Sequence, residues 1–297
     1  MEQIRIKSYG KVNLSLDVCG VRDDGYHLLR SIMQKIALHD YVDVSWTETD
    51  GEEILINLSC NKHYLPTDER NLAYKAAQMM IDKFGHQVGG GIIDIDIEKH
   101  LPVAAGLAGG SGNGAALIVA LNRLWGLKLD TKQMCALGEP LGADVPFCLL
   151  IQNTRYGCAL CEGTGTELTP LKSRFKRAVL LVKPNFGVST KEVYKGIDQC
   201  EITERPDTEA LVSALRANDG QVVYDNMINV LEEYTLANYQ EVKILKEKVA
   251  AETTAAKVLM TGSGPTVFAL FDKLSHAQKA CRKFRKEGYE AYWTTTL

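Results

Sequence analysis

The sequence lacks the features that mark fibrous, disordered and membrane-spanning proteins. Its 297 residues include 8 Pro and 25 Gly, with no internal repeat or low-complexity stretch, which excludes collagen-like and intrinsically disordered chains. No apolar run approaches the ~20 residues that span a bilayer, and residues 1–18 lack the apolar core of a signal peptide. We therefore expect a folded, cytoplasmic protein without a membrane partner.

An excess of positive charge is also missing. The chain carries 34 Lys and Arg against 37 Asp and Glu, a formal net charge of −3, so no global positive field attracts nucleic acid. Nucleic acid is therefore not an expected partner. An anionic substrate must be bound by local groups.

Cysteine spacings typical of metal sites or redox motifs are scarce. Of the 8 Cys, Cys158 and Cys161 form one C-x-x-C pair, and no second Cys or His pair follows at zinc-ligand spacing. We expect reduced thiols that pack in the core, and no protein metal site.

The first half of the chain combines strand and helix patterns. Apolar residues alternate with polar ones, as at Ile93, Ile95 and Ile97, which is the period of half-buried strands. Asp130 and Gln133 have the spacing of a helix capping box. The predicted strands are 12–18, 41–46, 53–58 and 93–97, and the predicted helices are 71–84, 115–125 and one that begins at Asp130.

A second pattern of the same kind begins after about residue 155. A capping box at Ser189 and Glu192 starts one predicted helix. The other predicted elements are helices at 207–216, 239–251 and 275–287 and strands at 178–183, 257–260, 266–271 and 289–295. We predict an α+β protein with two domains, residues 1–155 and 156–297.

The most informative segment is LPVAAGLAGGSGNGAA at residues 101–116, where five Gly precede a predicted helix. Glycine lets backbone amides approach an anion closely, and the free N–H groups and dipole of a helix start favour phosphate. The segment therefore predicts a phosphate-binding loop. A merely flexible loop is the alternative, which so many Gly against an Ala-rich helix start disfavour.

Two common nucleotide-binding motifs do not fit this segment. No Lys follows the glycines, as a Walker A loop requires. Residues 110–115 do fit G-x-G-x-x-A, but that fingerprint needs glycines directly after a strand in a βαβ unit. Residues 99–107 intervene here, and the flanking strands look antiparallel, which disfavours dinucleotide binding.

A second segment, LGADVPF at residues 141–147, places one carboxylate among small and apolar residues. We predict a strand here. A buried carboxylate is costly unless it is paired, so Asp144 should have a cationic partner or a chemical task. The alternative is an Asp at a helix end or turn. Lys11, at an otherwise apolar strand position, is the candidate partner.

Four segments, taken together, identify a family. They are GKVNLSLDVCGVRDDGYHLLRSIMQ, LPVAAGLAGGSGNGAA, LGADVPF and TGSGPTVFALF. Their order and separations closely resemble the galactokinase, homoserine kinase, mevalonate kinase and phosphomevalonate kinase (GHMP) superfamily. Within it, the first and third resemble the branch that phosphorylates a cytidine diphosphate polyol in non-mevalonate isoprenoid precursor synthesis. The resemblance covers nearly the whole chain.

The resemblance implies a fold and a phosphoryl donor. The N-terminal domain would be similar to the second domain of ribosomal protein S5, the C-terminal domain would be ferredoxin-like, and the active site would lie in the cleft between them. ATP would be the donor, accompanied by Mg²⁺ without a protein cage. The residues implied in ATP binding are Asn71 and Lys99 near the adenine, and Pro102, Gly106, Leu107, Gly109, Gly110, Ser111, Gly112, Asn113 and Gly114 at the phosphates.

The resemblance also implies catalytic and substrate-binding residues. Asp144 would accept the proton of the substrate hydroxyl, and Lys11 would pair with it and stabilise the developing alkoxide. The residues that match the family's substrate contacts are Tyr26, His27 and Tyr194 at the cytosine and Asn13 at the polyol.

The sequence departs from the family pattern at two glycines. Gly112 stands where this branch usually has a second Ser, and Gly114 stands where it has Ala. Two other functions stay open: another kinase of the superfamily, of the homoserine or mevalonate type, or a non-catalytic metabolite-binding member. Retention of Lys11 and Asp144 argues against the last, because a binding module does not need an expensive ion pair.

Overall fold

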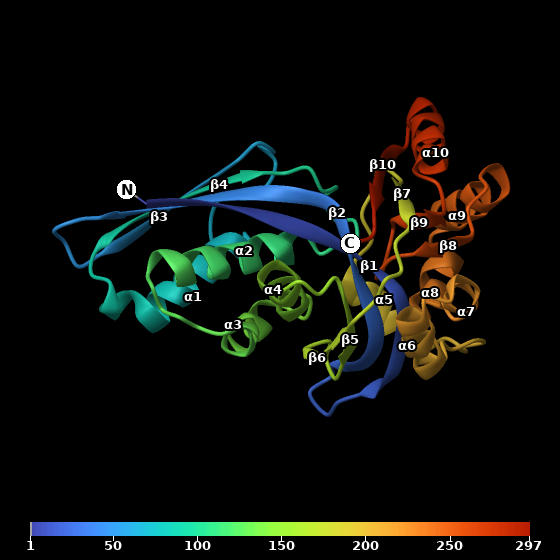
Figure 1. Ribbon diagram of the computed structural model, residues 1–297, viewed down its shortest axis with the longest axis horizontal. Coiled ribbons are helices and arrows are strands. Elements are labelled where there is room, and N and C mark those ends of the chain that lie inside the picture. Colours follow the sequence, from blue (N-terminus) through green and yellow to red (C-terminus); the bar gives the residue numbers. More distant parts are fainter. Residues whose placement is uncertain (1) are drawn as a thin grey trace. The chain divides into compact units, whose positions relative to one another are not determined.

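The computed structural model describes residues 2–297, which divide into two compact units (Figure 1). Unit 1 contains residues 2–10, 39–101 and 108–155, and unit 2 contains residues 11–38, 102–107 and 156–297. The predicted boundary at 155 and 156 is one point where the chain passes between units. Residues 11–38 and 102–107 group with unit 2 instead of the predicted first domain, because the two long N-terminal strands run through both units.

The elements that begin or lie in unit 1 come first along the chain. They are β1 (Glu2–Val21), β2 (His27–Glu48), β3 (Ile54–Cys60), α1 (Leu72–Phe84), a 3₁₀ turn η1 (Gly85–Gln87), β4 (Gly91–Glu98), α2 (Gly109–Leu124), α3 (Thr131–Gly138), a 3₁₀ turn η2 (Glu139–Leu141) and α4 (Val145–Asn153). The predicted capping box of α3 is confirmed, since Asp130 and Gln133 each bond the other's backbone N–H.

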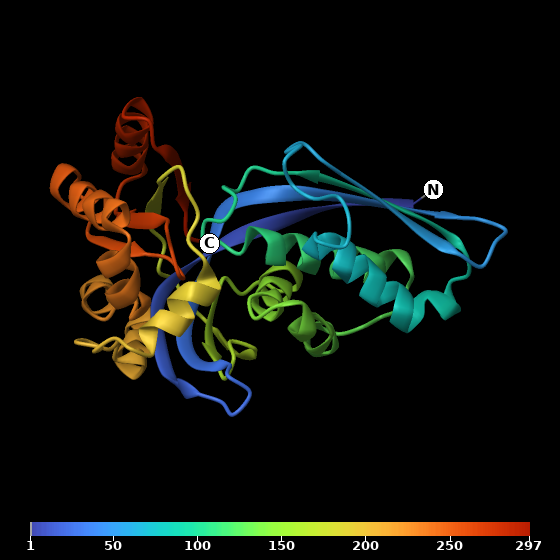
Figure 2. The same cartoon turned by 180° about the vertical axis from the view of Figure 1, so that it is seen from behind.

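The sheet of unit 1 carries all of its helices on one face. β2 pairs with β1 and, antiparallel, with β4, while β3 pairs with β4 in parallel. With α1 between them, β3 and β4 form a parallel βαβ unit, so the expectation that the strands flanking the glycine segment are antiparallel and not βαβ is wrong for this pair. Figure 2 shows the view opposite to Figure 1, and in both the helices α1 to α4 lie on the same side of the strands.

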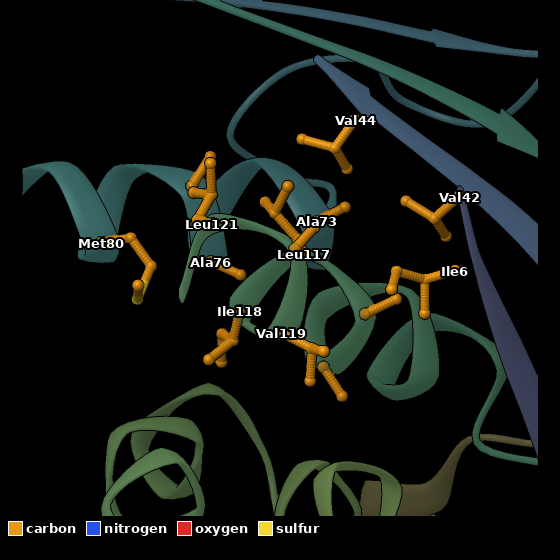
Figure 3. Packing of buried hydrophobic residues seen from close by; sticks show 14 of the residues in the cluster. Ile6, Val42, Val44, Ala73, Ala76, Met80, Leu117, Ile118, Val119 and Leu121 are labelled. Carbon is orange, nitrogen blue, oxygen red and sulfur yellow. The ribbon is translucent and has the colours of Figure 1, made fainter. Parts of the chain in front are cut away.

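The core of unit 1 forms where this sheet meets the helices. Leu117 and Leu121 of α2, Ala73 of α1, and Val42 and Val44 of β2 are buried together, as Figure 3 shows. The alternation predicted for β4 is confirmed, with Ile93, Ile95 and Ile97 at 2% exposure or less. Small residues let α1 and α2 approach closely, and this packing stabilises a helix whose start is rich in Gly.

Unit 2 is built on an antiparallel sheet with strand order β10-β7-β9-β8. Its elements are β5 (Cys158–Glu162), β6 (Glu167–Leu171), β7 (Ala178–Lys183), α5 (Thr190–Ile197), α6 (Thr208–Ala217), α7 (Gly220–Asp225), α8 (Leu231–Asn238), α9 (Gln240–Glu252), β8 (Lys257–Met260), β9 (Val267–Phe271), α10 (Leu274–Lys286) and β10 (Glu290–Thr295). The predicted strands and helices of this half are present, whereas β5, β6, α7 and α8 were not predicted. Within residues 2–297 no helix is long and apolar enough to cross a membrane.

Candidate active site

The second half of the glycine segment, residues 109–116, is helix rather than loop. The first turns of α2 contain Gly109, Gly110, Gly112 and Gly114, so the helix begins six residues before the predicted start at 115. Ala108 precedes the helix with φ of 58°, and the first intrahelical bond runs from the Gly112 N–H to the Ala108 carbonyl at 2.8 Å. The three N–H groups before it have no partner within the helix, which is the arrangement that binds phosphate.

The predicted phosphate-binding residues of unit 1 differ in their exposure to solvent. Gly110 is exposed, and Gly109 and Ser111 are partly exposed, whereas Gly112, Asn113 and Gly114 are buried. A Cβ on Gly110 would have only Leu72 as a neighbour, at 3.6 Å. The exposed backbone of 109–111 is therefore the part of this helix start that an anion can reach.

The two glycines that depart from the family pattern are closely packed. A Cβ on Gly112 would lie 2.6 Å from Ser8 Oγ, and one on Gly114 would lie 3.2 Å from the Leu72 carbonyl oxygen. A side chain at 112 must therefore displace the Ser8 hydroxyl. Gln152 of α4, which sequence reasoning missed, donates from Nε2 to the Gly112 carbonyl at 3.0 Å.

The predicted adenine residues have structural partners. Asn71 is the N-cap of α1, accepting from the Ala73 N–H at 2.9 Å and donating to the Pro66 carbonyl at 2.8 Å. Lys99 is buried and pairs with Asp40 at 2.5 Å. A direct contact of either side chain with ATP stays a prediction.

In unit 2, Lys11 and Asn13 belong to one buried polar cluster. Lys11 Nζ donates to Asn13 Oδ1 at 2.8 Å, and both residues are at most 3% exposed. Thr261, which was not predicted, donates to Asn13 Oδ1 and to the Gly106 carbonyl, both at 3.3 Å. Asn13 therefore holds the Lys11 ammonium, and Thr261 connects Asn13 to a distant part of the chain.

The segment 102–107 of unit 2 is held beside this cluster. The Lys11 N–H donates to the Leu107 carbonyl at 3.1 Å. Gly106 has φ of 68°, and a Cβ there would lie 2.5 Å from the Thr261 carbonyl oxygen, so the position requires Gly. Pro102 is buried.

Asp144 lies directly before α4, where a strand was predicted. It occupies the N-cap position but makes no capping hydrogen bond with its side chain, and it is partly exposed. The prediction of a strand is wrong, because Asp144 stands at a helix end. A chemical task for its carboxylate stays a prediction. The positive end of the α4 dipole favours a carboxylate at this place. Lys11 and Asp144 belong to different units, and their pairing stays a prediction.

The predicted cytosine residues of unit 2 are partly brought together. The rings of His27 and Tyr194 lie 5.1 Å apart, tilted by 41°. His27 Nε2 lies 2.8 Å from Oδ1 of Asp198, a residue that sequence reasoning missed. Tyr26 is 67% exposed. His27 and Tyr194 therefore form a ring pair with a carboxylate that orients one member.

All 8 Cys are free, and the C-x-x-C pair lies in β5. Cys158 and Cys161 are buried, and burial raises the pKa of the Cys158 thiol to about 12. The thiolate is the reactive form of cysteine. Four of the eight thiols pack in the core as predicted, whereas Cys60, Cys135 and Cys200 are partly exposed and Cys19 is exposed.

We expect Cys158 to resist iodoacetamide in the folded protein at about pH 8, since about one thiol in 10⁴ is ionised there. Peptide mass spectrometry after timed labelling checks this. Exposed Cys19 is the comparison within the same chain, and labelling in urea gives the unprotected rate. Labelling of Cys158 as fast in buffer as in urea would contradict its burial.

The fold and these residues define an ATP-dependent small-molecule kinase of the GHMP superfamily. Residues 71–151 match the GHMP kinases N terminal domain, and residues 207–290 match the GHMP kinases C terminal family. The 4-diphosphocytidyl-2-C-methyl-D-erythritol kinase of Clostridium novyi (strain NT) is 43% identical over 98% of this chain and 99% of its own. The chain belongs to the family of 4-diphosphocytidyl-2-C-methyl-D-erythritol kinases.

Solved structures agree with this membership. A crystal structure of 4-(cytidine 5'-diphospho)-2C-methyl-D-erythritol kinase superposes with a TM-score of 0.77 at 29% identity, covering 99% of both chains. Homoserine kinase from Cytophaga hutchinsonii gives 0.68 at 18% identity over 100% of this chain and 95% of its own, a likeness of fold alone. The protein is thus an ATP-dependent kinase of the non-mevalonate isoprenoid pathway that phosphorylates an alcohol group.

Proposed function

We propose that the protein transfers the γ-phosphate of ATP to the 2-hydroxyl of 4-diphosphocytidyl-2-C-methyl-D-erythritol. Family membership supports the substrate, and one observation in the structure supports it further: the ring pair of His27 and Tyr194, with Asp198 on the His27 ring nitrogen. A tilted aromatic pair offers both a stacking face and a polar edge to a nucleobase.

The ATP phosphates are proposed to bind the exposed start of α2. The N–H groups of residues 109–111 and the helix dipole supply partial positive charge there. Mg²⁺ is proposed to accompany ATP, where it neutralises phosphate charge. In the described part of the chain, no three Asp, Glu, His or Cys side chains gather to hold a metal.

Phosphoryl transfer then needs a proton acceptor and a positive charge. Asp144 is proposed to accept the proton of the 2-hydroxyl, and Lys11 to stabilise the alkoxide that develops. The Asn13 contact supports the role of Lys11, because it fixes a long side chain in one position. NMR of the product tests the proposal, because couplings to ³¹P identify the carbon that carries the new phosphate. A phosphate on another carbon, or equal turnover with mevalonate or homoserine, would contradict it.

The ring pair gives a binding prediction. We expect His27→Ala and Tyr194→Ala each to raise the substrate KM several-fold or more, since an aromatic pair contributes about 0.5–1.5 kcal/mol beyond buried area. The kcat should change less, because these contacts lie remote from the reacting hydroxyl. Steady-state kinetics with each substrate varied measures both constants.

The control for this prediction is Tyr64→Ala, an exposed tyrosine of unit 1, which should leave both constants unchanged. Asp198→Asn should shift the substrate KM in the same direction as His27→Ala, because it removes the carboxylate that orients the ring. An unchanged substrate KM in both ring variants would assign the cytosine to another surface.

A further inference from the structure

One buried carboxylate in unit 1 lies at the centre of a hydrogen-bond network. The Asp40 side chain is 0% exposed. Its Oδ1 accepts from the backbone N–H groups of His100 and Leu101, both at 2.8 Å. Its Oδ2 accepts from Lys99 Nζ at 2.5 Å and from Asn113 Nδ2 at 3.0 Å. Four donors saturate a carboxylate, so Asp40 has no capacity left for another ligand.

The network connects two segments on either side of the helix start. Residues 99–101 directly follow β4, and Asn113 lies in the second turn of α2. Asn113 also accepts from Lys99 Nζ at 3.1 Å and donates to Ser8 Oγ at 3.1 Å. A Cβ on Gly109 would lie only 3.0 Å from Lys99 Nζ, so the ammonium lies against the first turn of the helix. Asp40 is therefore the group that both segments share.

We propose that Asp40 is a positioning residue of the ATP site, which fixes the first turns of α2 through Asn113 and Lys99. The inference rests on the proposed binding of phosphates at 109–111. Lys99 and Asn113, which the family resemblance implies as ATP contacts, would then act instead through the geometry of the helix start. Backbone donors bind an anion best when their positions are set before it arrives.

The amide of an Asp40→Asn variant can satisfy only one side of this network. If its oxygen keeps the His100 and Leu101 N–H groups, its NH₂ meets the donors of Lys99 and Asn113. If it turns round, its NH₂ meets the two backbone donors. Either way one connection breaks, and we expect the Kd for ATP to rise about tenfold or more. The KM for the cytidine diphosphate substrate should stay close to that of the parent.

A second change should restore the connection. In Asp40→Asn with Lys99→Met, the lysine donor is gone and Asn113 can rotate its amide. Its oxygen then accepts from the new amide and from the Ser8 hydroxyl. Replacing both charges by neutral groups also removes an unpaired buried ammonium. We expect the double variant to bind ATP within a few-fold of the parent. If Lys99 were itself an ATP ligand, the double variant would bind no better than Asp40→Asn.

The experiment measures the ATP Kd by calorimetry in the full chain, with hydrogen exchange at the amides of residues 112–116. Faster exchange without ATP in Asp40→Asn, reversed in the double variant, is the expected signature of a positioning role. Leu245→Ala, in the buried core of unit 2, is the matched destabilised control and should keep the parental ATP Kd. If Asp40→Asn does not fold, Asn113→Ala breaks the same connection while leaving the ion pair, and should raise both Kd and exchange.

Three outcomes overturn the inference. Parental ATP affinity in Asp40→Asn, or in the substitute Asn113→Ala, contradicts it directly. Failure of the double variant to recover affinity assigns Lys99 to ATP itself. A Gly110→Asp variant separates these results from failure of the proposed function: if it loses ATP binding, the helix start is the phosphate site and only the role of Asp40 is in question. If it keeps ATP binding, both the proposed phosphate site at 109–111 and the positioning role of Asp40 are contradicted.

Discussion

An Asp144→Asn variant is expected to lose about 10²–10⁴-fold in turnover while it still binds ATP. The amide keeps the shape of the carboxylate but cannot accept the proton of the substrate hydroxyl. Folding should be little affected, because Asp144 stands at the start of α4 and Asn is as well suited as Asp to a helix start. Single-turnover phosphorylation measures the chemical step, and calorimetry measures ATP binding.

The matched control is the same change at another helix start. Asp207 caps α6 by accepting from the Ala210 N–H at 2.9 Å. Asn caps a helix equally well, so Asp207→Asn should leave turnover unchanged. Turnover within a few-fold of the parent in Asp144→Asn would show that another group accepts the proton.

The parts of the fold that were predicted correctly depend on short-range patterns. The alternation of Ile93, Ile95 and Ile97 identifies β4, because successive side chains of a strand point to opposite faces. The capping box of Asp130 and Gln133 identifies the start of α3 in the same way. Such signals lie within one turn or a few strand positions, so a single sequence contains them.

The errors occur where local signals are weak or ambiguous. Residues 141–147 form a short apolar run, and such a run does not distinguish a strand from a buried helix. Pro146 at the start of α4 was the available signal, since Pro is favoured in a first helical turn. The start of α2 was misplaced because Gly disfavours helices, whereas close packing against Ser8 and Leu72 favours Gly at 112 and 114.

Sequence motifs identified residues of the candidate site, but they did not identify the partners that those residues contact. The glycine segment and Asp144 were found because unusual residue types stand together in the chain. Asp40 lies 59 residues from Lys99 and 73 from Asn113, and Asp198 lies 171 from His27. No periodicity spans such separations, so these partners become visible only once the chain is folded.

A Gly110→Asp variant is expected to lose ATP binding by about 100-fold or more without losing stability. The new carboxylate would lie in the first turn of α2, where a negative charge is favoured by the helix dipole. Removal of a Gly from a helix adds stability, and the Cβ has room beside Leu72 at 3.6 Å. The same carboxylate repels the triphosphate, and at an effective dielectric constant of about 20 two unit charges about 4 Å apart repel by about 4 kcal/mol.

Two measurements separate this effect from damage to the helix. Thermal unfolding should give a Tm equal to or above that of the parent, while calorimetry shows the loss of ATP affinity. Gly110→Asn is the matched neutral variant, similar in size and without the charge, and should lose much less affinity than Gly110→Asp. The difference between the two should shrink in high salt, because exposed charges are screened. Equal loss of ATP affinity in both variants would indicate that bulk at this position, and not charge, excludes ATP. Parental ATP affinity in both would show that the phosphates do not bind at the start of α2.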